Sequence, residues 1–188
     1  MHLVENYALA AGAKIGMPTI QTSFFPVGSE KYITLHACSG MNSKNYDYYK
    51  DVVKILTPKI EEEGYDIVQI GEEGEAQIKG VRSLLGQTTV RQTIFIIKNA
   101  ALHIGNDSFS CHAASAYNTP LVTLYGATRP ECCGPYWGDK EKQELLCPDL
   151  PDFKPSYSKS ERSKRVNKIF PDEVAEKALN LLGIPNEL

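Results

Sequence analysis

The chain has 188 residues, of which 42% are hydrophobic and 23% charged, as in one globular domain with its own core. Its formal net charge of −3 predicts no general affinity for nucleic acid or for anionic membranes. No apolar stretch is long enough for a membrane span, and Met1 to Gly12 has neither the basic start nor the apolar core of a signal peptide, so we expect a cytoplasmic protein.

The beginning of the chain is modestly apolar and has no clear period. His2 to Ala13 can form a helix that stops at Gly12 to Gly16, and Pro18 and Pro26 mark an extended segment after it. We therefore expect an N-terminal arm, residues 1–30, and one folded domain, residues 31–188.

The first strand of that domain is expected at Tyr32 to Ala37, and a helix at Tyr46 to Glu63. The loop between them contains Ser39, Gly40 and Lys44. Backbone N–H groups, hydroxyls and one ammonium group can converge on a phosphate in such a loop. Alone this is weak evidence, because the loop is no Walker sequence and lacks the G-x-G-x-x-G spacing.

The second strand, Asp66 to Ile70, leads into an acidic turn with Glu72, Glu73 and Glu75. In nucleotide-binding α/β domains, a carboxylate after the second strand accepts hydrogen bonds from both ribose hydroxyls. A simple charged turn explains these glutamates equally well.

Two further segments precede the most informative part of the chain. Ile78 to Leu85 predicts a short helix. Thr88 to Asn99 is rich in β-branched residues and fits either a helix or a strand, but its place before another strand favours a helix.

A βαβ unit is predicted in the middle of the chain. It comprises a strand at Ala101 to Gly105, a polar turn, a small-residue helix at Phe109 to Tyr117, a stop at Asn118 to Pro120 and a strand at Leu121 to Tyr125. Both strands are apolar without alternation, as expected of parallel strands covered on both faces. The helix would then be the right-handed crossover.

The start of this helix is a candidate anion site. Ser108 or Asp107 can cap it, and the remaining N–H groups together with the helix dipole would favour a phosphate or carboxylate. His112 lies one turn into the helix, on the side of the same opening. The alternatives are that the Asp-Ser pair is only an N-cap and that the histidine is only structural.

The remainder of the chain is irregular up to its last helix. Glu131 to Ser160 predicts a long surface loop, and the basic cluster Lys159 to Lys168 is best explained as a solvated face. Pro171 to Leu182 predicts a closing helix that ends at Gly183. The five cysteines are odd in number and form no C-x-x-C pair, so neither a disulfide framework nor a metal site is expected.

The stretch from His103 to Pro130 resembles the signature of the heptosyltransferase-like glycosyltransferases, glycosyltransferase family 9. In that pattern an Asp-Thr-Gly-x-x-His turn precedes an alanine-rich helix, a small-x-Pro stop and a strand that ends in a Gly-x-Thr-x-Pro loop. Here the turn is Asp107 to His112 and the loop is Gly126 to Pro130. Phe109 replaces the glycine of the motif, which would narrow or reshape the donor site.

The resemblance covers Tyr32 to Leu182 and implies the C-terminal, donor-binding half of a GT-B glycosyltransferase. The expected fold is α/β: a single Rossmann-like domain with a mostly parallel sheet of about five or six strands. The arm would correspond to the tail of the missing first domain, or would simply pack on this one. By resemblance the donor phosphates and sugar would contact Ser39, Gly40, Lys44, Asp107, Ser108, Phe109 and His112, and the ribose or base Glu72 or Glu75, with Glu75 favoured.

Three functions follow from the resemblance. In the family the acceptor site and the general base belong to the N-terminal domain, so the chain would be the donor half of a split glycosyltransferase for hexosyl or heptosyl transfer, completed by a second chain or by self-association. It would use a nucleotide-diphosphate sugar as substrate and no metal or other cofactor. The alternatives are a catalytically silent module that binds a nucleotide or nucleotide sugar, favoured by Phe109, and a fragment of a longer enzyme.

Overall fold

Six strands form one sheet in the order β3-β2-β1-β4-β5-β6, and every neighbouring pair is parallel. The computed structural model describes residues 1–150 and 154–186. The strands are β1 (Tyr32–His36), β2 (Asp66–Gln69), β3 (Arg82–Ser83), β4 (Leu102–Asn106), β5 (Leu121–Leu124) and β6 (Gln143–Leu146). This is the strand order of dinucleotide-binding domains. The first three strands extend the sheet toward one edge and the last three toward the other, so the order switches between β1 and β4. The predicted Rossmann-like domain is confirmed.

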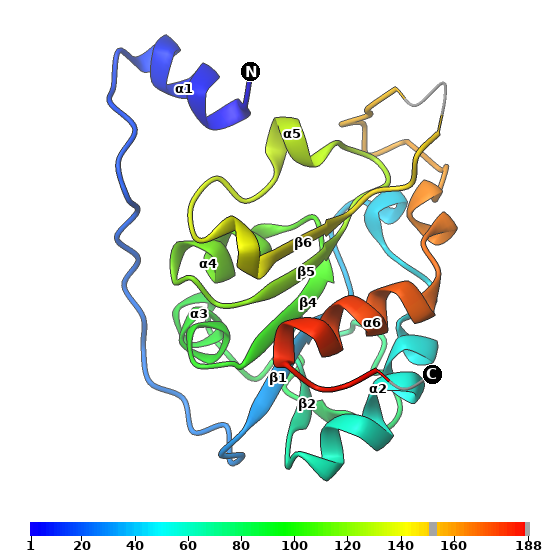
Figure 1. Ribbon diagram of the computed structural model, residues 1–188. Helices are drawn as coiled ribbons and strands as arrows, with labels where there is room; N and C mark the ends of the chain where they lie inside the picture. Colours follow the sequence, from blue (N-terminus) through cyan, green and yellow to red (C-terminus); the bar gives the residue numbers. More distant parts are fainter. Residues whose placement is uncertain (151–153, 187–188) are drawn as a thin grey trace.

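Helices cover both faces of the sheet (Figure 1). The helices are α1 (Leu3–Ala11), α2 (Tyr49–Glu62), α3 (Val90–Lys98), α4 (Phe109–Ala116), α5 (Pro130–Cys133) and α6 (Pro171–Leu182), with short 3-10 turns η1 (Asn42–Lys44), η2 (Lys140–Lys142) and η3 (Arg165–Lys168). The pair α2 and α6 packs on one face, and the pair α3 and α4 on the other (Figure 1). None of the helices in the described part of the chain has the length and apolar character needed to cross a membrane.

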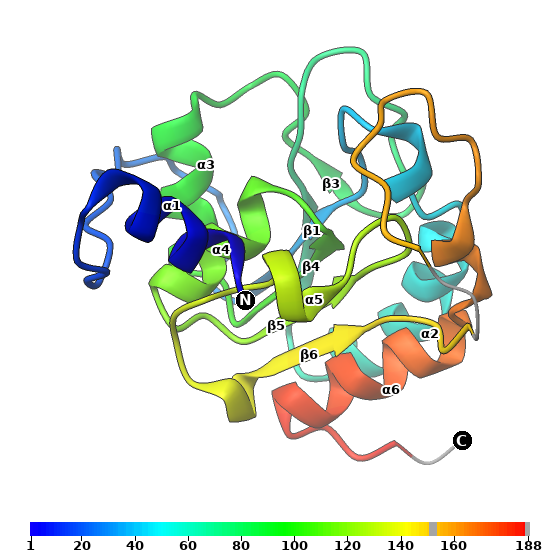
Figure 2. The same cartoon turned by 90° about the horizontal axis from the view of Figure 1, so that it is seen from above.

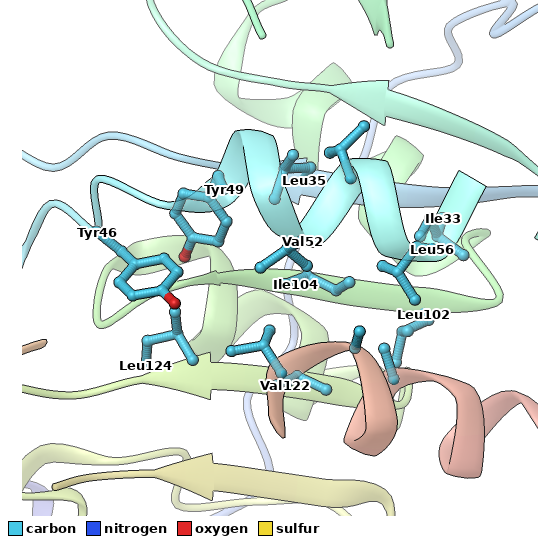
Figure 3. Close-up of a cluster of buried hydrophobic side chains, with 14 of the residues drawn as sticks. Ile33, Leu35, Tyr46, Tyr49, Val52, Leu56, Leu102, Ile104, Val122 and Leu124 are labelled. Carbon is cyan, nitrogen blue, oxygen red and sulfur yellow. The ribbon is translucent and has the colours of Figure 1, made fainter. Parts of the chain in front are cut away.

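The continuous apolar runs of the central strands arise because both faces are buried. On one face, Ile33, Leu35 and Ile104 of the strands meet Val52 and Leu56 of α2, as Figure 3 shows. Each such side chain contributes about 1.5–3 kcal/mol when it is fully buried. Two separate apolar cores therefore fix the helices on the two sides of the sheet.

The predicted helices around the central strands are present. α3 begins with a capping box, in which the Thr89 hydroxyl accepts from the backbone N–H of Gln92 and the Gln92 side chain accepts from the backbone N–H of Thr89. α6 spans Pro171–Leu182 as expected and ends at Gly183, whose φ of 71° only glycine adopts readily. The βαβ unit is β4-α4-β5.

The short helix predicted for Ile78 to Leu85 is wrong. The segment is extended, and its residues Arg82–Ser83 form the edge strand β3 beside β2. Gly80 interrupts any helix here because its φ is 89°. The buried Gln69 side chain also fixes the backbone from Ala76 to Ile78 in a non-helical conformation, since it donates to Ala76 O at 3.0 Å and accepts from Ile78 N at 2.8 Å.

The long loop predicted for Glu131 to Ser160 is interrupted by regular structure. α5 and η2 lie within it, and β6 extends the sheet by pairing with β5. Four residues carry too little periodicity to reveal such a strand. Residues 151–153 of the expected loop lie outside the described ranges. Lys159, Arg162 and Lys168 of the basic cluster are exposed as expected. Lys164 and Arg165 are partly buried, and Lys164 pairs with Asp47 and thereby links η3 to the loop after η1.

The N-terminal arm lies along the outside of the domain (Figure 1). Its helix α1 packs beside α5, where the His2 imidazole bonds to the carbonyl of Gly134 at 2.9 Å (Figure 2). Farther along the arm, the Trp137 indole N–H donates to Gly16 O at 2.9 Å. α1 has no buried residue, and Tyr7 and Leu9 are 69% and 71% exposed. The helix α1 is thus attached by polar contacts and leaves apolar side chains in solvent, whereas the later part of the arm packs Val27, Ile20 and Phe25 against the apolar core under α3 and α4.

Candidate functional site

A cleft of about 870 Å³ opens where the carboxyl ends of β1, β2 and β4 meet. It is lined by His36, Cys38, Ser39, Gly40, Lys44, Asn45, Gly71, Glu72, Glu73, Glu75, Gly86, Thr88, Val90, Thr93, Asp107, Ser108 and Phe109. Open parallel sheets bind ligands at this place, the switch point between β1 and β4. The volume is in the range of small-molecule and cofactor sites.

The structure brings most of the predicted site residues together. The donor candidates Ser39, Gly40, Lys44, Asp107, Ser108 and Phe109 line the cleft, and so do the glutamates Glu72 and Glu75. His112 does not line it. Its half-buried imidazole lies near Asp107 on α4, and burial lowers its pKa while the Asp107 charge opposes that shift.

An ion pair crosses the switch point at the floor of the cleft. Lys44 Nζ, which follows β1, lies 2.6 Å from Oδ2 of Asp107, which follows β4. The Thr128 hydroxyl donates to the same carboxylate oxygen. The side chain of Lys44 is 16% exposed and that of Asp107 is 5% exposed. The carboxylate therefore holds the lysine in place, and the ammonium is the more accessible of the two charges.

Ser108 occupies the N-cap position of α4, but its side chain does not cap the helix. The cap predicted for Ser108 is wrong because the hydroxyl is engaged elsewhere: it lies 3.0 Å from His36 Nδ1 and 3.0 Å from Ser110 Oγ. The Ser108 side chain therefore leaves the N–H groups of the first turn of α4 without the usual N-cap partner. These groups and the positive end of the helix dipole favour an anion at the opening of the cleft.

The loop after β1 is braced from within. The Asn45 amide accepts from Ser39 N at 2.7 Å and donates to Ser39 O at 3.3 Å. The Ser39 hydroxyl accepts from Met41 N at 3.3 Å, which leaves the hydroxyl proton for a ligand. Gly40 has open space around its Cα.

The opposite wall of the cleft is acidic. Glu72 and Glu73 are exposed, whereas Glu75 is folded back against Gly71. A Cβ on Gly71 would lie 2.1 Å from Oε2 of Glu75, so this glycine permits the approach. That oxygen is buried, and the same carboxylate interacts with the Cys38 thiol. The Cys38 thiol lies nearby, and burial together with the Glu75 charge raises its pKa to about 11.

With this geometry in view, similarity to known proteins decides the family. The sequence model of glycosyltransferase family 9 (heptosyltransferase) matches residues 9–161. The chain belongs to glycosyltransferase family 9. It is 31% identical over 93 residues to lipopolysaccharide heptosyltransferase 2 of Escherichia coli (strain K12), which covers 43% of the chain and 27% of that protein.

Solved structures of family 9 proteins share the fold over half of their length. The chain superposes on the E. coli ADP-heptose lps heptosyltransferase II with a TM-score of 0.62 at 20% identity, over 95% of this chain and 50% of that one. The dodecameric iron-containing glycosyltransferase TibC from enterotoxigenic E. coli H10407 gives a TM-score of 0.70 at 13% identity, over 90% and 50% of the two chains. This family 9 chain therefore matches one half of a GT-B heptosyltransferase.

Sequence reasoning missed several residues of the family 9 cleft. His36 is the last residue of β1, and its position at the carboxyl end of a strand could have identified it. Thr88, Val90 and Thr93 line the cleft from α3 and the residues before it, and no motif distinguishes them in the sequence.

One group of side chains in the described ranges has the composition of a metal site. Ligand atoms of Asp107, Cys111 and His112 lie within 4.8 Å of one another. They fit a metal poorly, because the ammonium of Lys44 already neutralises the Asp107 carboxylate through Oδ2, to which Thr128 also donates, and because burial raises the pKa of the Cys111 thiol to about 12. We therefore derive no metal chemistry from this group, although TibC is iron-containing by its description.

Two buried histidines below the cleft predict a loss of stability in mild acid. Burial lowers the pKa of His36 from 6.5 to about 4 and that of His103 from 6.5 to about 3. Between pH 6.5 and pH 4, these two histidines bind protons in the unfolded chain but stay neutral in the folded chain. The free energy of unfolding should therefore fall as the pH is lowered through that window. Urea unfolding at pH 7, 6 and 5 measures it. His36→Asn should flatten the slope, and an unchanged slope would contradict the assignment.

Proposed function

We propose that this chain binds the diphosphate of a nucleotide-sugar donor in the cleft. The observation that carries the proposal is the convergence of Lys44, the start of α4 and Glu75 on one space. Lys44 and the first-turn N–H groups of α4 supply positive charge and donors for the diphosphate. Glu75, which also lines the cleft, supplies a carboxylate for the ribose hydroxyls. The description of the E. coli structure as an ADP-heptose enzyme makes an adenine nucleotide the first donor to test.

The same groups would assist sugar transfer. As the bond between the sugar and the diphosphate breaks, negative charge grows on the leaving phosphate. Lys44 and the first-turn N–H groups are already placed and need no reorganisation to stabilise that charge. These residues bind and stabilise the leaving group, and we assign no catalytic base among them.

We further propose that the chain acts as the donor half of a split glycosyltransferase, completed by a second chain or by self-association. It spans 50% of the solved relatives. Exposed apolar side chains on α1, among them Tyr7 and Leu9, offer surface for such an association. TibC, described as dodecameric, is a precedent for assembly within the fold.

A silent nucleotide-binding module is the second candidate. Phe109 favours it, because this aromatic ring is 46% exposed and lines the cleft where the family motif has a glycine. Such a protein would bind free nucleotides at least as well as nucleotide sugars and would not release the sugar.

Calorimetric titration with nucleotide-diphosphate sugars and free nucleotides tests the proposal, with the mass in solution recorded alongside. We expect saturable binding of ADP and ADP-heptose, and slow hydrolysis of ADP-heptose by a donor half, in which water accepts the heptose and ADP leaves. Glu75→Gln should weaken both ligands about tenfold by removing a charged acceptor. Glu176→Gln, on the exposed side of α6, is the matched control and should change nothing. A well-folded chain that binds none of these ligands would refute the donor site.

A further inference from the structure

A continuous chain of polar side chains runs from the sheet to the cleft. Thr34 Oγ1 lies 3.0 Å from His103 Nδ1, and His103 Nε2 lies 3.0 Å from Ser110 Oγ. From Ser110 the chain continues to His36 Nδ1 at 3.0 Å and to Ser108 Oγ at 3.0 Å. His36 Nδ1 is also 3.0 Å from Ser108 Oγ, so these three atoms form a closed triangle directly below the start of α4.

The network is built into the core. Thr34, His103 and Ser110 are 0% exposed and His36 is 6% exposed. Gly105 packs closely against the His103 ring, because a Cβ at this position would lie 3.1 Å from His103 Nε2. Burial keeps both imidazoles neutral, so each ring offers one donor and one acceptor.

Counting protons gives the network one direction. Thr34 can donate only once, and a backbone acceptor, Leu102 O, lies 3.4 Å from its hydroxyl. When Thr34 donates there, His103 Nδ1–H donates to Thr34, and Ser110 must donate to His103 Nε2. Ser110 then has only lone pairs left for the triangle. A proton on Nδ1 of His36 then gives the triangle two donors, Nδ1–H and the Ser108 hydroxyl, for its three contacts, whereas the other tautomer gives it only one. The reverse direction of donation leaves the contact between the Thr34 hydroxyl and Leu102 O without a proton.

We propose that His36 is a positioning residue for the bound phosphate. Its Nδ1–H donates to Ser108 Oγ, and the Ser108 hydroxyl is thereby free to donate its single proton to a phosphate oxygen in the cleft. His103 and Ser110 act behind it by fixing which nitrogen of His36 carries the proton. The inference rests on the proposed function, since it concerns the anion of that same site.

A double-mutant cycle with ADP and inorganic pyrophosphate as probes tests it. Ser108→Ala should weaken both probes by about 10–100-fold, the range for a hydrogen bond to a charged group. His36→Leu should lose a similar factor. His36→Asn, whose amide N–H can take the place of Nδ1–H, should stay within about threefold of the parent chain. The double variant His36→Leu/Ser108→Ala should bind no more weakly than Ser108→Ala alone, because both changes remove the same interaction.

Two results would overturn the inference. One is independent effects of the two substitutions, so that the losses of affinity multiply in the double variant. The other is unchanged affinity in His36→Leu. Side-chain ¹⁵N NMR of the ADP-bound parent chain gives an answer even where His36→Leu does not fold, since a proton on Nε2 instead of Nδ1 of His36 would also overturn it. If the parent chain binds neither probe, the proposed function fails and this inference with it. If the parent chain binds ADP but the cycle shows independence, only this inference fails.

Discussion

Replacement of Lys44 by methionine should abolish measurable binding of ADP and also lower the free energy of unfolding by about 3 kcal/mol. The ammonium group is the positive charge that we assign to the diphosphate. It is also the partner of Asp107 at 2.6 Å, whose side chain is 5% exposed. Methionine keeps the length of the side chain but leaves the carboxylate charged, buried and held only by Thr128 and weaker contacts.

A second substitution separates the two effects. In Lys44→Met/Asp107→Asn no buried charge is left unpaired, and the asparagine oxygen can still accept from Thr128. Urea unfolding should therefore show most of the lost stability restored, while calorimetry should still show no ADP binding. Restored binding in the double variant would mean that Lys44 serves only to neutralise Asp107, and parent-like affinity in Lys44→Met would remove it from the donor site altogether.

The position of the cleft is predictable from the sequence because it depends on topology. Two strands without alternation, at Ala101 to Gly105 and Leu121 to Tyr125, indicate a parallel sheet covered on both faces. In such a sheet the residues that follow each strand meet at one edge. Topology together with the resemblance to family 9 therefore assigns Lys44, Glu75 and Asp107 to one site although they are far apart along the chain, and all three line the cleft.

Features that depend on individual side-chain contacts could not be predicted. Ser108 has the sequence position of an N-cap, and only the structure shows that its hydroxyl contacts His36 and Ser110 instead of capping the helix. His112 follows the motif but does not line the cleft, because the orientation of a helix about its axis is set by core packing. The edge strands β3 and β6 are too short for their periodicity to be visible, and both need a neighbouring strand to form.

The substitution Phe109→Gly should raise the affinity for ADP-heptose by about tenfold or more relative to ADP, the difference expected from removing a steric conflict of about 1.4 kcal/mol. Phe109 is the first residue of α4, and its ring packs edge-on against His36 with a centroid distance of 5.6 Å. That ring occupies the space which the glycine of the family motif leaves open for the donor. Because the side chain is 46% exposed, its loss should cost little core packing.

The comparison between two ligands makes this experiment informative about function. ADP lacks the heptose, so its affinity should change little. Phe170→Gly at the start of α6 controls for loss of an exposed aromatic residue. A selective gain for ADP-heptose would mean that Phe109 narrows the part of the cleft that takes the sugar in the natural chain. A loss for ADP-heptose would instead make the ring a platform on which the sugar packs, and would contradict the narrowing of the site. The donor half of a split enzyme would then be the better description, because its aromatic residue would recognise the group to be transferred.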